Sequence, residues 1–308
     1  MKHSGRKILT IVIIVLILFS LSYTAAKLFG GTLTSTEDKI AVIEINGPIT
    51  SGGFKIPLQR TGASSETLIK FLEQAEESKE IKAVLLDINS PGGTVVASRE
   101  VAEKVKSLKK PVVAFINEIG TSGAYWIASA ADKIVADPLS ITGSIGVIAS
   151  YLEFADLMEK YGVTYEQLIS GKYKDLGSPF KKLTPEEHRL IQKKIDKIHE
   201  AFIREVAANR KLPVQDVEKI ATGEYFLGEE AKELQLVDEV GTRDLALNIT
   251  KQLIGVQKVT LVKFEETKSL LSLLTNLQSE ALYSLGQGIG SEMSKNIEVQ
   301  KTPQFYAV

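Results

Sequence analysis

Two short apolar segments are each followed by a turn of small residues and then by a helical pattern. Residues 83–88 and 111–116 are largely apolar, which is typical of strands buried on both faces of a sheet. Residues 89–93 (Asn-Ser-Pro-Gly-Gly) follow the first segment, and residues 120–125 (Gly-Thr-Ser-Gly-Ala-Tyr) follow the second. Because strand, turn and helix alternate, the sequence predicts an α/β domain with a parallel sheet.

The same periodicities predict the other elements. Strands are expected over residues 40–45, 133–136, 236–237 and 259–264, and helices over residues 65–78, 94–108, 126–131, 151–161, 184–209, 214–221, 227–233 and 243–254. Residues 50–62 are expected to form a loop, and residues 165–181 an irregular segment. These elements predict one α/β domain over residues 38–265.

The N-terminal end has the pattern of a membrane anchor. Residues 2–7 carry three positive charges, and an apolar run follows from Ile8 to about Ala26. This run approaches the about 20 residues that span a bilayer. The charges predict a cytoplasmic N-terminus, with the rest of the chain on the other side of the membrane. Small residues at 24–26 leave a cleaved signal peptide as the alternative. Residues 1–37 are therefore expected to comprise the basic end, a transmembrane helix and a linker.

Composition excludes several kinds of chemistry. The net charge is −1, so nothing indicates a nucleic-acid partner. There is no cysteine, which excludes a thiol nucleophile, a disulfide framework and a cysteine-ligated metal. With three histidines and no metal-ligand spacing in the chain, no metal site is predicted.

The turn at residues 120–125 could carry a nucleophile. Ser122 would lie between a strand and a helix, near free backbone N–H groups at the positive end of the helix dipole. The parallel sheet would bring the two glycine-containing turns to one edge, so the N–H groups of Gly93 and Gly123 could stabilise an oxyanion. The alternatives are that Ser122 only caps the helix and that residues 91–93 only form a turn.

The general base is harder to identify from the residues alone. His188 and His199 lie on one charge-rich helix, mostly away from its apolar stripe, and are expected to be solvated. A lysine could act as base only if burial lowered its pKa, because a solvated amine is protonated at neutral pH. Lys172 and Lys174 are flanked by apolar residues, but both could equally be surface lysines.

Four motifs occur in the order found in the signal peptide peptidase A family of serine–lysine peptidases, which the chain resembles. They are residues 89–93, residues 121–125, residues 142–147 (Thr-Gly-Ser-Ile-Gly-Val) and residues 170–175 (Ser-Gly-Lys-Tyr-Lys-Asp). The resemblance covers about residues 38–265 and the anchor, and it is to a short, single-repeat bacterial form. It implies the Clp/crotonase-like fold, a parallel-sheet domain with helices.

The resemblance also implies a role for each matching residue. Ser122 is the implied nucleophile, and Lys174 is the implied general base. Ser144 matches the residue whose hydroxyl orients the lysine amine. Gly93 and Gly123 match the backbone donors of the oxyanion hole. The resemblance implies no cofactor and no metal.

The implied protein is a membrane-anchored serine endopeptidase of the cell membrane with an extracytoplasmic catalytic domain. Its implied substrates are remnant signal peptides and similar extended apolar peptides, with misfolded membrane or secreted proteins as further candidates. A single repeat implies a ring-like homo-oligomer, in which a neighbouring subunit could supply the lysine. A crotonase-like acyl-CoA enzyme and a non-catalytic membrane scaffold that binds peptides remain as alternatives.

The C-terminal residues 266–308 differ in composition from the domain. An amphipathic, leucine-rich helix is expected over residues 268–285, followed by a flexible tail that is rich in glycine and serine and ends in Tyr306-Ala307-Val308. Because this end resembles a peptide substrate, one hypothesis is that it docks in the catalytic groove as an added strand. A terminus with no role is the alternative.

Overall fold

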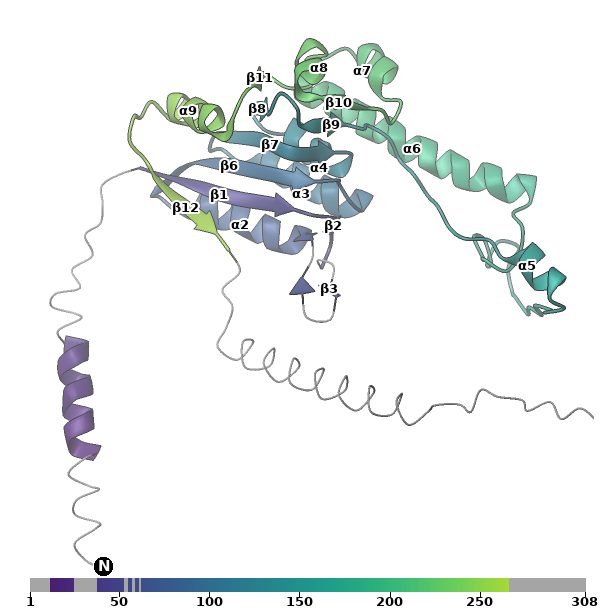
Figure 1. Ribbon diagram of the computed structural model, residues 1–308, viewed down its shortest axis with the longest axis horizontal. Coiled ribbons are helices and arrows are strands. Elements are labelled where there is room, and N and C mark those ends of the chain that lie inside the picture. The colour runs from purple at the N-terminus through teal and green to yellow at the C-terminus, as the bar shows by residue number, and fades with distance from the viewer. Residues whose placement is uncertain (1–11, 25–37, 53–54, 57–58, 61, 266–308) are drawn as a thin grey trace, which may run out of the picture. The chain divides into compact units, whose positions relative to one another are not determined.

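The computed structural model describes residues 12–24, 38–52, 55–56, 59–60 and 62–265 (Figure 1). The chain divides into two units, residues 1–37 and residues 38–308. The described part of the first unit is a helix over residues 12–24. No helix of the described residues is both long and apolar enough to cross a membrane, so the predicted transmembrane helix is not confirmed. The predicted helix and tail at residues 266–308 lie outside the described residues.

The second unit is built on an eight-stranded sheet, which confirms the predicted α/β fold. Its central order is β10-β9-β7-β6-β1-β12, while β8 pairs with β7 and β11 pairs with β8. The pairs are parallel except for β9 and β10. The strands are β1 (Lys39–Asn46), β6 (Ile81–Ser90), β7 (Val112–Thr121), β8 (Lys133–Ala136), β9 (Ile141–Gly143), β10 (Tyr225–Leu227), β11 (Glu239–Val240) and β12 (Thr260–Phe264).

Helices cover both faces of this sheet, with α2, α3 and α4 on one face and α9 on the other (Figure 1). In β1, Ala41 and Ile43 belong to the core cluster under α2 and α3, whereas Ile40 and Val42 belong to the cluster under α9. Burial on both faces explains why the central strands are almost continuously apolar. The helices of this unit are α2 (Ser65–Glu77), α3 (Val95–Ser107), α4 (Gly123–Ser129), α5 (Ala155–Lys160), α6 (Pro185–Arg210), α7 (Val214–Ile220), α8 (Gly228–Glu233) and α9 (Arg243–Ile254).

Residues 147–184, here called the arm, extend away from the sheet and carry α5 (Figure 1). The arm ends where Thr184 begins α6 with a capping box, as the sequence predicts. Many large apolar side chains of the arm are exposed, including Leu168 at 95% and Ile148 at 91%. A surface of this kind is typical of a segment that packs against another chain.

Several predictions of local structure are wrong. The strands predicted to end at residues 88 and 116 continue to Ser90 and Thr121, and the helix predicted over residues 126–131 spans Gly123–Ser129. Residues 50–62 were expected to be a loop but contain parts of short strands, namely β2 (Ile49–Thr50), β3 (Lys55–Ile56) and β4 (Gln59–Arg60), and β5 (Ala63–Ser64) follows. Leu236 and Val237 are not a strand, because their N–H groups bond to the carbonyl of Ala231 at the end of α8. The short strand there is β11, two residues later.

Candidate active site

Ser122 stands between β7 and α4 in a strained backbone conformation, with φ 53° and ψ −123°. Its N–H donates to the carbonyl of Gly143 at 2.8 Å, and its own carbonyl accepts the N–H of Trp126 at 2.9 Å. The side chain of Ser122 does not cap the helix, so the helix-cap alternative fails and the hydroxyl stays available. Non-glycine residues hold such a conformation mainly at functional sites, where a sharp strand-to-helix turn exposes a nucleophile.

Two backbone N–H groups lie beside this turn. The carbonyl of Gly92 and the N–H of Thr94 both bond to Ile49 of β2, which holds the loop between them in place. Within the described residues, the N–H groups of Gly93 and Gly123 donate to no backbone carbonyl. A Cβ atom placed on Gly123 would lie 3.3 Å from the nitrogen of Gly93, so the two glycines are close neighbours. Such a pair of free donors can stabilise an oxyanion.

Ser144 follows β9 and also has positive φ, at 50°. Its N–H donates to the carbonyl of Glu224 at 2.8 Å, and its hydroxyl donates to the carbonyl of Gly223 at 3.1 Å. The segment between α7 and β10 therefore fixes both the backbone and the side chain of Ser144.

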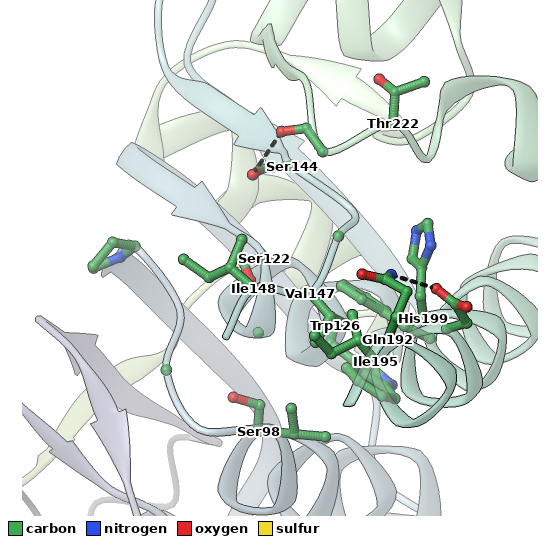
Figure 2. A pocket seen from close by; sticks show the side chains of 18 residues that line it. Ser98, Ser122, Trp126, Ser144, Val147, Ile148, Gln192, Ile195, His199 and Thr222 are labelled. Carbon is green, nitrogen blue, oxygen red and sulfur yellow. Dashed lines mark hydrogen bonds between the residues drawn. The ribbon is translucent and has the colours of Figure 1, made fainter. Parts of the chain in front are cut away.

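Ser122, Ser144 and the two glycines line one pocket of about 500 Å³ (Figure 2). Helix α6 forms one wall with polar and apolar side chains that are not among the predicted site residues. This set is Gln192, Ile195, Asp196, His199 and Phe202. Gln192, Ile195 or Asp196, His199 and Phe202 follow one another at intervals of three or four residues, which is the spacing of one helix face, and this pattern could have revealed the set. Its apolar part continues across the pocket through Trp126, whose ring stacks on Phe202 at a centroid distance of 4.2 Å.

The two histidines of α6 differ in their surroundings. His188 is exposed, as the sequence predicts. His199 is only half-buried but faces the pocket, and its Nε2 lies 3.2 Å from the carbonyl oxygen of Ile145. The prediction that His199 is simply solvated is therefore wrong.

Lys174 does not lie in the pocket of Ser122. It is exposed on the arm and lines a separate hollow with residues 165–169 and 175–178. Lys172 is held in an ion pair, with its Nζ 2.7 Å from Glu186. The hydrogen bond to Glu186 is the main cause that raises the pKa of Lys172, and a hydrogen bond to Tyr173 is the second. The amine of Lys172 therefore stays protonated at neutral pH and cannot accept the proton of a nucleophile.

The chain on the C-terminal side of Lys174 is anchored to the start of α6. Lys181 lies 2.6 Å from Asp175 and 2.6 Å from Glu187, and these two carboxylates are only 11% and 5% exposed. The hydrogen bond from Lys181 is the main cause that lowers the pKa of both carboxyl groups. Within the described residues, no group of three or more acidic or histidine side chains could hold a metal ion.

A strained serine beside two backbone N–H groups that donate to no carbonyl of the described residues is an arrangement typical of serine hydrolases. The sequence matches the family described as Peptidase family S49 over residues 104–257, and Clp protease over residues 55–138. Among its relatives, MJ0651 of Methanocaldococcus jannaschii, provisionally named a protease, is 40% identical over 90% of this chain and 88% of its own.

Two further relatives carry more specific names. A protein of Enterococcus faecium, provisionally named signal peptide peptidase SppA, is 33% identical over 78% of this chain and 73% of its own. Serine protease SPPA, chloroplastic, of Arabidopsis thaliana is 35% identical over 84% of this chain, but the match spans 39% of that protein. The chain belongs to peptidase family S49. It is a serine protease with peptide substrates, which decides against the acyl-CoA enzyme and the non-catalytic scaffold.

Proposed function

We propose that the protein is an endopeptidase that uses a serine–lysine dyad of Ser122 and Lys174. Lys174 takes the proton of the Ser122 hydroxyl while the oxygen attacks the peptide carbonyl, and the N–H groups of Gly93 and Gly123 stabilise the oxyanion. The protonated amine then gives its proton to the leaving amine, and water hydrolyses the acyl-enzyme. The observation that carries this proposal is the strained turn of Ser122 beside the N–H groups of Gly93 and Gly123, which donate to no backbone carbonyl of the described residues.

We further propose that Lys174 acts on Ser122 of a neighbouring subunit in a ring-like homo-oligomer. Two observations support this arrangement. Lys174 lies outside the pocket of its own Ser122, and the arm that carries it exposes many large apolar side chains. An oligomer interface would bury those side chains and desolvate the amine, which favours its neutral form.

The proposed substrates are remnant signal peptides and similar extended apolar peptides. The apolar part of the pocket wall, with Val95, Trp126 and Phe202, suits an apolar side chain next to the scissile bond. The provisional name of the Enterococcus faecium relative supports the same substrate class. The basic end and apolar run at residues 1–26 support an anchor in the cell membrane, with residues 38–265 as the extracytoplasmic peptidase domain.

The direct test of this function is to trap the acyl-enzyme. Full-length protein is incubated with a slowly hydrolysed ester of an apolar peptide, quenched in acid and digested, and the acyl group is located by mass spectrometry. The acyl group is expected on Ser122 in the wild type and in the Lys172→Ala variant, and it should be absent from Lys174→Ala. Acylation at another residue would refute Ser122 as the nucleophile.

Lys172→Ala is expected to leave peptide turnover within about twofold of the wild type, because an exposed ion pair with Glu186 contributes little.

The turnover of the wild type and of Lys172→Ala should rise with pH, since an amine acts as a base only after losing its proton. Initial rates between neutral and alkaline pH measure this. A dispensable Lys174 beside an essential Lys172 would reverse the assignment.

A further inference from the structure

The turn that carries Ser144 is paired with residues 222–224 by backbone hydrogen bonds in both directions. The N–H of Ser144 donates to Glu224, and the N–H of Gly223 donates to Ile145 at 3.1 Å. The hydroxyl of Ser144 adds a third bond to Gly223. Because the hydroxyl of Ser144 uses its hydrogen in the bond to the carbonyl of Gly223, its oxygen can only accept a hydrogen bond from a further partner, such as an amine.

His199 reaches this turn from α6. Its Nε2 lies 3.2 Å from the carbonyl oxygen of Ile145, which already accepts the N–H of Gly223. A carbonyl has two lone pairs and no proton, so Nε2 must be the donor in this bond. Around the pocket, Ser122, Ser144 and His199 come from three different parts of the chain (Figure 2).

We propose that His199 is a positioning residue, which holds the turn of Ser144 through the carbonyl of Ile145. Ser144 has positive φ and lies next to Gly143, which also has positive φ, so an unsupported turn could relax toward ordinary backbone angles. A shift of about 1 Å in such a turn can reduce turnover about 100-fold. This inference rests on the proposed serine–lysine dyad and on the role that the family resemblance implies for Ser144, which is to orient the lysine amine, and it assigns His199 no proton transfer.

Matched substitutions separate positioning from proton transfer. His199→Gln places an amide N–H near the position of Nε2, whereas the side chain of His199→Asn is one bond too short. The Gln variant should retain about half of the wild-type kcat, and the Asn variant should lose about 10- to 100-fold in kcat with KM nearly unchanged. His188→Asn, on the same helix and exposed, is the control and should behave as the wild type.

Each result decides the proposal. Equal loss in His199→Gln and His199→Asn would show that the ring itself reacts, and full activity in both would show that the bond is dispensable. Either result refutes the positioning role. Thermal unfolding of each variant, with rates measured well below its midpoint, ensures that folded protein is compared.

A double variant distinguishes this inference from the proposed function. If His199 acts through Ser144, adding His199→Asn to Ser144→Ala should reduce kcat no further than Ser144→Ala alone. Additive losses would refute the inference while leaving the role of Ser144 intact. Full activity of Ser144→Ala alone would instead refute the proposed role of Ser144.

Discussion

Ser122→Ala and Lys174→Ala are each expected to abolish peptide hydrolysis, with a loss on the order of 10⁴-fold or more. Neither side chain fills the core, because Lys174 is exposed and Ser122 faces the pocket, so both variants should fold as the wild type does. Peptide turnover and circular dichroism measure the two expectations. A Lys174→Ala variant with near-normal turnover would remove Lys174 from the mechanism.

Mixing the two inactive variants tests whether the lysine comes from a neighbour. In a ring assembled at random from equal amounts of the two chains, roughly a quarter of the sites combine an intact Ser122 with an intact neighbouring Lys174. Co-expression of the variants with different affinity tags should therefore restore roughly a quarter of the wild-type turnover. The control pairs Ser122→Ala with the double variant and should stay inactive. No recovery in purified mixed rings would show that both groups act within one subunit.

Gly93→Ala is expected to reduce kcat by about 10²- to 10³-fold, which is the usual effect of losing one oxyanion donor. A Cβ atom at this position would lie 1.9 Å from the carbonyl oxygen of Ile49, so the loop must move and carry the N–H of Gly93 away from the oxyanion. KM should change much less, because the substrate carbonyl gains most of its negative charge in the transition state. Steady-state rates with one peptide measure both constants.

Gly52→Ala is the matched control for this change. Gly52 lies on the same segment as Ile49, but a Cβ atom there would have no neighbour within 4 Å. This variant should keep wild-type turnover. Near-normal kcat in Gly93→Ala would exclude Gly93 as a donor, and equal losses in both variants would indicate a general disturbance of the segment.

The sequence predicts the sheet well because burial leaves a strong pattern. The strand over residues 133–136 and the helix over residues 243–254 have the predicted bounds, since a buried strand leaves a short apolar run and an amphipathic helix leaves a period of about 3.6 residues. The short strands between residues 49 and 64 could not be predicted in this way. Two-residue strands have no periodicity, and Ile49 pairs with Gly93, which is distant in the sequence.

The candidate site also contains residues that the sequence pattern can place and residues that it cannot. Ser122, Gly93 and Gly123 lie just beyond the carboxyl ends of β6 and β7, which are neighbouring parallel strands, so the sheet topology brings them together. His199 could not be placed from local pattern, because its contact with Ile145 joins residues 54 positions apart. The distance between Lys174 and the pocket depends on the path of the arm, which has little regular structure and no pairing rule to predict it.

The strained backbone of Ser122 lowers the stability of the fold at the same position that the proposed activity requires. A conformation of this kind costs about 1–3 kcal/mol in any residue except glycine, out of a net folding free energy of about 5–15 kcal/mol. Its hydrogen bonds to Gly143 and Trp126 hold the turn in place but do not remove that cost. Glycine at position 122 would make the fold more stable but would remove the proposed nucleophile. Random mutation selected only for thermal resistance would therefore drive this enzyme toward a sturdier, inert protein.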